Sequence, residues 1–217
     1  KAKVSDVSRK PWWPPLRRNL SSIKVFENAV PASTAFFYGF LIMTTLQSEH
    51  LTLRPYVEAD FDIMARLHGT PAVMVHMRDG AVSREDARRY FDSYARNWDT
   101  NGISVWALFR THDDAYVGEC GFWLREGFAG YALRYILAEP YWRQGLAGEA
   151  AETALQWAFK SRQIPEVNAV SHVDNPGSVR ILRRLGFSLA DTAHKNLVGM
   201  HRYRITREDW LQREGGS

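Results

Sequence analysis

The sequence predicts an α+β fold built on a mixed sheet, and three observations support it. Strand-like runs and amphipathic helical runs follow in an irregular order: one strand, two helices, three strands, a helix, a strand, a helix and two strands. The chain has 217 residues, of which 45% are apolar, which is enough for one packed domain with an extension. No internal repeat appears, which argues against a solenoid.

The excess positive charge lies in an extension, residues 1–45. The whole chain has a net charge of +4 and a pI of about 9.3. Residues 1–45 hold seven Lys or Arg against two Asp or Glu, whereas residues 46–217 hold 21 against 22, a net charge of −1. A nucleic-acid-binding domain is expected to carry a basic patch of its own. The distribution therefore predicts no nucleic-acid partner, and a binder acting through the extension is the remote alternative.

The extension also differs from the remainder in the pattern of its residues. Pro11–Pro15 (PWWPP) interrupts any regular structure, and the nine-residue apolar run 35–43 is shorter than the roughly 20 residues that span a bilayer. We expect this run to pack on the domain or contact a partner, or the segment to be a cloning or start-site artefact with Met43 as the true start. The single cysteine, Cys120, excludes an intramolecular disulfide and suits a reducing compartment. We therefore expect a cytoplasmic protein with no membrane partner.

The first half of the domain, which we place at residues 46–217, opens with a strand. Alternation of apolar and polar residues predicts it at Leu51–Pro55. Helical spacing of apolar residues and capping signals predict the next two elements, at Glu58–His68 and at Ser83–Trp98 with Ser83 as N-cap. Three strand-like runs separated by turn residues follow, at Ser104–Arg110, Tyr116–Leu124 and Tyr131–Leu137.

The second half alternates helices and strands. A helix is predicted over Gly145–Arg162, then a strand over Glu166–Val173. A short helix over Pro176–Leu185 ends at Gly186, a residue type that favours helix termination. The last elements are expected at Leu189–His194, His201–Ile205 and, as a terminal helix, from Thr206.

The junction between the strand ending at Leu137 and the following helix carries the most specific signal. Gly145, Ala147 and Gly148 are small, so an anion can approach the free amides of the first helical turn. Arg143 adds a positive charge. Neither a Walker loop nor the G-x-G-x-x-G dinucleotide motif is present. The pattern predicts a phosphate or pyrophosphate site, and a Gly-rich helix start that only packs on the sheet is the alternative.

Two separated motifs resemble the GNAT acetyltransferase superfamily. They are Trp142–Ala150 (WRQGLAGEA) and Asn175–Phe187 (NPGSVRILRRLGF). The opening Leu51–Pro55 and the closing Tyr203–Trp210 resemble the branch of ribosomal-protein N-terminal alanine or serine acetyltransferases. The resemblance covers roughly residues 49–212. It implies a mostly antiparallel sheet of about seven strands that splays between the fourth and fifth strands, flanked by about four helices.

The resemblance also implies acetyl-CoA as co-substrate and direct transfer of its acetyl group to a primary amine in a ternary complex. The acceptor would be a protein N-terminus, an amino acid, a polyamine or an antibiotic. An amide near Ile136 or Leu137 would polarise the thioester carbonyl. The implied acetyl-CoA contacts are the pyrophosphate site at Arg143, Gln144, Gly145, Leu146, Ala147 and Gly148, the strand edge at Tyr135, Ile136 and Leu137, and Asn175 and Ser178.

Three positions depart from the family pattern. Trp142 stands where the family has Gln or Arg, Leu182 where a tyrosine often acts as general acid, and Ala132 near an often acidic position. The binding half of the pattern is therefore more complete than the proton-transfer half. A catalytically silent acyl-CoA-binding module is the main alternative to an enzyme.

The expected catalytic residues are Glu119, His172 and Ser178. Glu119 lies in an apolar strand where burial can raise its pKa, and an imidazole at His172 suits deprotonation of an amine. Each has a plainer interpretation: a solvent-facing strand residue, a surface histidine, and for Ser178 a helix cap. A water relay without a single base is also open, and Cys120 is expected in the core.

The remaining charged clusters are less specific. The seven histidines show no HExxH or other ligand spacing, so we expect no metal. A solvated helix face is the main interpretation of Arg180, Arg183 and Arg184, with contact to the 3′-phosphate of CoA as the alternative. A homodimer is left open.

Overall fold

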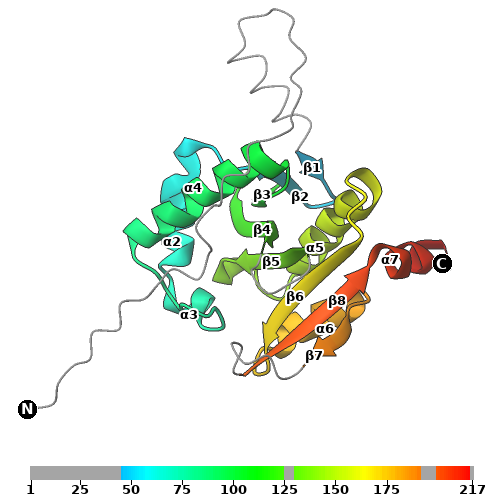
Figure 1. Ribbon diagram of the computed structural model, residues 1–217. Helices are drawn as coiled ribbons and strands as arrows, with labels where there is room; N and C mark the ends of the chain where they lie inside the picture. Colours follow the sequence, from blue (N-terminus) through cyan, green and yellow to red (C-terminus); the bar gives the residue numbers. More distant parts are fainter. Residues whose placement is uncertain (1–44, 125–129, 192–198, 216–217) are drawn as a thin grey trace, which may run out of the picture.

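The computed structural model describes residues 45–124, 130–191 and 199–215 of the chain, and these form an eight-stranded mixed sheet covered by helices on both faces (Figure 1). The strand order is β1-β2-β3-β4-β5-β6-β8-β7. The extension up to residue 44 and the end of the strand expected at Leu189–His194 lie outside the described residues. The predicted α+β class with a mixed, mostly antiparallel sheet is confirmed.

The strands lie close to their expected positions. β1 is a two-residue strand that sequence alternation could not reveal. The full set is β1 (Leu46–Gln47), β2 (Leu51–Pro55), β3 (Val105–Arg110), β4 (Tyr116–Leu124), β5 (Tyr131–Leu137), β6 (Glu166–His172), β7 (Ser188–Asp191) and β8 (Met200–Thr206).

The helices also follow the expectation, with two refinements. The helix expected over Gly145–Arg162 ends its α-helical part at Gln156 and continues as one π-helical turn. A four-residue helix, α3, was not expected. The full set is η1 (Glu58–Asp60), α2 (Phe61–His68), α3 (Pro71–Met74), α4 (Arg84–Asn101), η2 (Glu139–Tyr141), α5 (Leu146–Gln156), η3 (Trp157–Ser161), α6 (Pro176–Arg184) and α7 (Arg207–Gly215).

Helix α4 shows why these predictions held. The side chain of Ser83 accepts a hydrogen bond from the amide of Asp86, and Gly102 ends the helix in the left-handed conformation with φ of 61°. Its buried residues recur at helical spacing and face the sheet: Ala87, Tyr90, Phe91, Tyr94 and Trp98.

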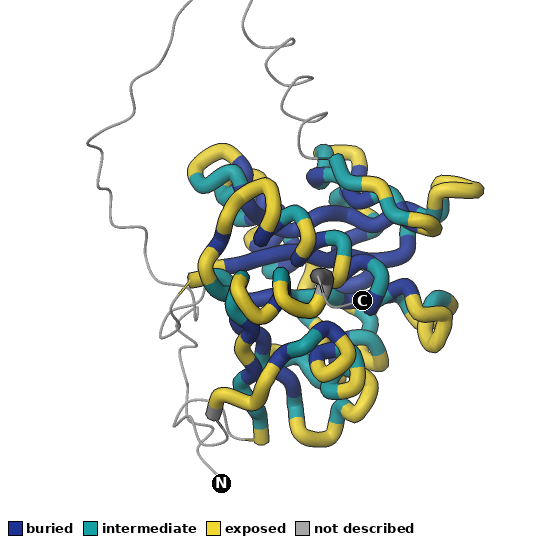
Figure 2. The backbone as a smooth tube through the Cα atoms, turned by 90° about the vertical axis from the view of Figure 1, so that its right-hand side faces the viewer, coloured by how far each residue is buried: buried dark blue, intermediate teal, exposed yellow. Residues whose placement is uncertain are grey.

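Buried segments are concentrated in the middle of the molecule (Figure 2), and their side chains form two main cores on opposite faces of the sheet. On one face, α2 and α4 pack Met64 and Tyr94 against Val105 and Trp123 of the strands. On the other face, α5 and α6 pack against a larger set that includes Trp106, which is fully buried. Because strand side chains alternate between faces, Leu137 of β5 belongs to the larger core, whereas its neighbour Ile136 packs in a small third cluster with Leu67 and Met74.

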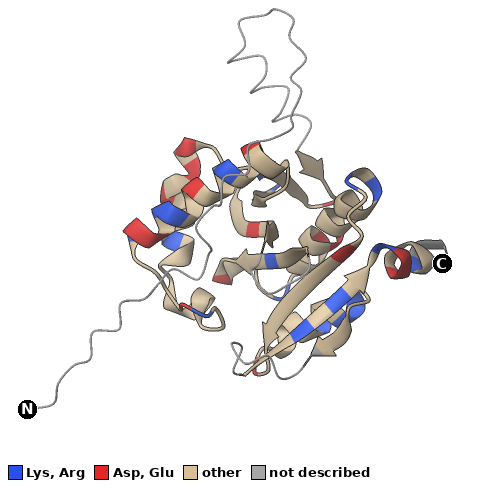
Figure 3. Ribbon diagram, viewed as in Figure 1, with Lys and Arg blue, Asp and Glu red and all other residues tan. Residues whose placement is uncertain are grey.

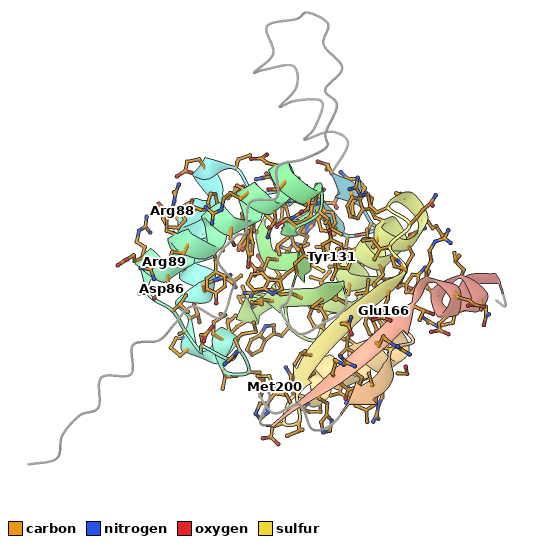
Figure 4. All side chains as sticks on the ribbon, in the orientation of Figure 1. Asp86, Arg88, Arg89, Tyr131, Glu166 and Met200 are labelled. Carbon is orange, nitrogen blue, oxygen red and sulfur yellow. The ribbon has the colours of Figure 1, made fainter. Side chains whose placement is uncertain are left out.

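The sheet divides between β5 and β6. These strands pair in parallel only at Tyr131–Leu133, which face residues 167–169, and no pairing continues along Arg134–Leu137 within the described residues. Figure 4 labels Tyr131 and Glu166 at the paired end and Met200 at the opposite end of β8. The splay between the fourth and fifth of the expected strands is therefore present, and it leaves one edge of β5 open.

Candidate active site

The loop before α5 forms a cradle of free backbone amides. Gly145 is the N-cap with φ of 83°, and Arg143 also has a positive φ, of 60°. Within the described part of the chain, none of the amides of residues 143–147 donates to a backbone carbonyl. Space beside Gly145 is open, since a Cβ there would meet no atom within 4 Å. These amides and the helix dipole suit an anion.

Arg184 adds a second cation to this cradle. Its guanidinium lies directly against the Cα of Gly148, so a side chain at Gly148 would collide with it. A larger residue at position 148 would therefore displace the guanidinium of Arg184 from the first turn of α5. Arg184 is exposed, as the interpretation of a solvated helix face predicts, and its guanidinium also lies beside the predicted phosphate site.

A cavity of about 160 Å³ occupies the gap between β5 and β6. Side chains from both faces of the sheet line it, so it passes through the sheet where pairing stops. Leu133 and Tyr135 belong to the α5 face, and Ala132 and Arg134 belong to the α4 face. The segment Met74–Gly80 closes the α4 side, and α6 closes the other.

Tyr135, Ser178 and Asn175 meet on the α5 side of the cavity. The hydroxyl of Tyr135 lies 2.9 Å from Ser178 Oγ, and it also reaches the carbonyl of Ser178 at 3.3 Å. Asn175, not Ser178, caps α6, because its Oδ1 accepts the amide of Ser178 at 3.1 Å. The interpretation of Ser178 as a helix cap is therefore wrong, and its hydroxyl faces the cavity with Tyr135.

Burial keeps the Tyr135 hydroxyl protonated. Burial raises the pKa of Tyr135 above its usual value, and the hydrogen bond to Ser178 only partly offsets this. The pair can therefore donate a hydrogen bond to an anion in the cavity. From the sequence, only the backbone of Tyr135 was expected at the site, because no local pattern places its hydroxyl against Ser178, 43 residues further along the chain.

The open edge of β5 presents Leu137 and not Ile136. The amide of Ala138 donates to Val117 of β4, and strand alternation therefore directs the amide of Ile136 to β4 as well. Leu137 faces the gap, where its carbonyl accepts the indole N–H of Trp142 at 2.7 Å. Of the two amides considered for an oxyanion role, Leu137 is the one on the open edge.

Glu119 is the centre of a buried polar cluster behind the cavity. Its carboxylate accepts hydrogen bonds from four groups and is fully buried. The donors are His68 Nε2 at 3.0 Å, Tyr56 and Tyr94 hydroxyls at 3.1 Å, and Arg134 Nε at 2.9 Å. The interpretation of Glu119 as a solvent-facing residue is therefore wrong.

The pKa of Glu119 is lowered, contrary to expectation. Burial alone raises it, but attraction to His68 and Arg134 and the hydrogen bonds from His68 and Tyr56 outweigh burial and hold the pKa at about 2. A carboxylate of that pKa with four donors has little basicity left for an amine. The pattern of an acid in an apolar strand located the cluster but gave the wrong sign for the pKa.

His172 lines the cavity on the same face as Arg134. Its Nδ1 accepts the backbone amide of Asp174 at 3.1 Å, and its ring stacks on His76 with centroids 5.8 Å apart. A neutral His172 therefore carries its proton on Nε2. Cys120 is buried in the core as expected, and burial raises the pKa of its thiol.

Comparison with known proteins agrees with the class of protein that the motifs predicted. A family model for the acetyltransferase (GNAT) domain matches residues 50–188, so the chain belongs to the GNAT acetyltransferase family. The uncharacterized N-acetyltransferase p20 of Bacillus licheniformis is 25% identical over 147 residues, which are 67% of this chain and 83% of that protein.

Solved structures share the fold. An acetyltransferase from Agrobacterium tumefaciens has a TM-score of 0.68 at 22% identity, covering 85% of this chain and 99% of that one. RimL, a ribosomal-protein α-N-acetyltransferase solved in complex with coenzyme A, has a TM-score of 0.64 at 17% identity, covering 75% and 97%. The expected likeness to the ribosomal-protein branch is confirmed at the level of the fold.

Two further observations concern the described ranges alone. None of their helices combines the length and apolar character needed to cross a membrane. Within the same ranges, no three His, Cys, Asp or Glu side chains gather in a way that could hold a metal ion.

Proposed function

We propose that this protein is an N-acetyltransferase that moves the acetyl group of acetyl-CoA to a primary amine by direct attack in a ternary complex. The observation that carries the proposal is the cavity through the split sheet. One side of it adjoins Tyr135 and Ser178, and the other adjoins Arg134 and His172. Donor and acceptor could therefore enter from opposite faces and meet between β5 and β6.

The residues present fit acetyl-CoA. When bound, it would supply an acyl group activated as a thioester. The free amides of residues 143–147, with the cations of Arg143 and Arg184, suit its phosphates. The open edge of β5 leaves backbone groups for an amide-bearing arm, and the family membership supports the same donor.

Two groups are placed to stabilise negative charge during transfer. The amide of Leu137, on the open edge of β5, would donate to an oxyanion. The hydrogen-bonded hydroxyls of Tyr135 and Ser178 would donate to a thiolate. Tyr135 thus takes the place of the tyrosine that the family often has at the position of Leu182, which is buried here.

Proton removal from the amine needs no single side-chain base in this proposal. Glu119 is saturated by four donors, and His172 already uses Nδ1 as an acceptor. A water relay through the cavity remains, one of the three routes considered from the sequence. An efficient general base contributes about 100- to 10,000-fold to a rate. If Glu119 or His172 were such a base, replacing it would lower kcat by a factor in that range.

The family model begins at residue 50, and β1 begins at Leu46. We propose that the catalytic unit spans residues 46–217 and that residues 1–45 are an appended segment.

Release of CoA from acetyl-CoA in the presence of a panel of primary amines tests the proposed function. We expect amine-dependent CoA release and an N-acetylated product identified by mass spectrometry. Tight binding of acetyl-CoA without product from any amine would instead identify a silent binding module.

A further inference from the structure

We propose that the acceptor is an amino acid with a free carboxylate, and that Arg134 binds this carboxylate. The inference rests on the proposed N-acetyltransferase function and narrows its acceptor. It depends on three observations: how Arg134 is held, which of its atoms remain without a partner, and which charges and surfaces share the cavity with it.

Arg134 is fixed on the acceptor side of the cavity. Its Nε donates to Glu119 at 2.9 Å, and its side chain is 10% exposed. The guanidinium carbon lies 5.5 Å from the ring centre of Tyr90 and 5.8 Å from that of Trp123. Since the aromatic rings and Glu119 restrict its rotamers, the guanidinium is presented in one orientation.

The two terminal nitrogens of Arg134 are available to a ligand. Neither donates a hydrogen bond to any residue in the described ranges, although both Arg134 and its aromatic neighbours line the cavity. Glu119 does not line the cavity and is shared with His68. A guanidinium held by Nε thus leaves its terminal N–H groups for a planar carboxylate, whose two oxygens match their spacing.

The other charges in the cavity do not cancel Arg134. Arg78 and Asp79 both lie exposed at the rim, and Asp79 accepts the hydroxyl of Tyr90 at 3.2 Å. Glu119 is the charged residue of β4 and Arg134 is the charged residue of β5, and Figure 3 colours the acidic and basic segments of the sheet. Asp79 is the single carboxylate in the described lining. A polycationic acceptor such as a polyamine would therefore meet the guanidinium of Arg134 with only one carboxylate to balance its several positive charges.

The remaining lining is apolar and adaptable. Three methionines face the cavity, from α3, from the loop after it and from β8, together with small or branched apolar side chains. Methionine side chains adjust to irregular shapes. These side chains belong to Met74, Met77, Met200, Ala132, Val170 and Leu182. This lining suits an acceptor with an apolar body beside its amine and carboxylate.

Arg134 also favours the reactive form of the amine. A positive charge near the attacking nitrogen disfavours its ammonium form, because like charges repel in a poorly solvated site. The acceptor carboxylate would bind Arg134 while its amine reached the gap beside Leu137. This arrangement agrees with the lack of a free side-chain base.

The first experiment uses the unaltered protein and matched acceptors. Alanine, leucine, methionine and phenylalanine are compared with their carboxamides and with spermidine, by kcat/KM with acetyl-CoA. We expect at least one amino acid to exceed its own carboxamide by about 10- to 100-fold, the range for a hydrogen bond to a charged group. The carboxamide has the less basic amine, so amine reactivity alone would favour it.

Variants then assign the preference to Arg134. Arg134→Gln should abolish the selectivity for the carboxylate, and Arg134→Lys, which keeps a cation beside Glu119, should retain part of it. Arg89→Gln is the matched control, because Arg89 lies on the outer face of α4 and pairs there with Glu85 and Asp86 (Figure 4). Retained CoA binding shows that each variant is folded.

A binding measurement separates this inference from the proposed function. The same amino acids and carboxamides are titrated into the protein saturated with CoA, so that no turnover is needed. Binding of amino acids but not carboxamides, lost in Arg134→Gln, supports the inference even where no product forms. Better binding or turnover of the carboxamides would overturn it and point to a polypeptide N-terminus, and preference for spermidine would overturn it as well.

Discussion

Replacing Glu119 by glutamine removes the charge at the centre of the buried cluster while keeping the size of the side chain. The carboxylate has a pKa of about 2, compared with 4.5 for an unperturbed glutamate. Burial acts in the opposite direction, so the cluster more than compensates for desolvation. This difference is worth about 3 kcal/mol of unfolding free energy at pH 7, at about 1.4 kcal/mol for each pKa unit.

The sign follows from the lowered pKa. A carboxylate whose pKa is depressed in the folded state contributes fully above its unfolded pKa of about 4.5, and the contribution falls as the pH drops towards about 2. About 1 kcal/mol should remain at pH 3. Glutamine also leaves Arg134 without an anion, and breaking a buried pair costs about 3–5 kcal/mol. Both routes predict a loss of at least about 3 kcal/mol at pH 7.

Urea denaturation followed by tryptophan fluorescence measures this difference between the wild type and Glu119→Gln at pH 7 and pH 3. The control is Glu85→Gln, whose carboxylate is exposed on α4 and should change stability by less than about 1 kcal/mol. The reasoning is refuted by a loss below about 1 kcal/mol at pH 7, or by a difference that stays constant between the two pH values.

Four other predictions use single substitutions. Gly145→Glu should abolish CoA binding in calorimetry, because it places a carboxylate beside the amide cradle; retained micromolar binding would contradict the site. Ser178→Ala should lower kcat by about 10-fold or more with little change in CoA affinity, if its hydroxyl helps to stabilise the thiolate; an unchanged rate would remove it from the mechanism. His172→Ala should lower kcat by less than about 10-fold, and a loss of 100-fold or more would restore it as general base. Trp106→Ala should cost about 3–5 kcal/mol in urea denaturation, since the side chain is fully buried; a cost below about 1 kcal/mol would contradict its place in the core.

Local patterns were sufficient for most of the fold. The apolar spacing of α4 and the cap at Ser83 depend on residues close in sequence, and the structure confirms them. β1 and α3 were missed because two- and four-residue elements carry no period. The splay between β5 and β6 was predicted from the family resemblance alone. No local sequence pattern indicates where two parallel strands stop forming hydrogen bonds with each other.

The site was predictable where it is contiguous in sequence and not where the fold assembles it. The cradle at residues 143–147 is one continuous segment, so its small residues were sufficient to predict it from the sequence. The contacts of Glu119 come from four other elements or loops, and their sum decides the sign of its pKa. The pairing of Tyr135 with Ser178 and the exposure of Arg134 to the cavity depend equally on tertiary structure.

The most direct test is a reaction with isotopically labelled acetyl-CoA and the matched amino acids and carboxamides, with products identified by mass spectrometry. We expect label on the amine of an amino acid and far less on its carboxamide. Bound acetyl-CoA with no labelled product from any amine would contradict the proposed activity, and label mainly on carboxamides would contradict the acceptor assigned to Arg134.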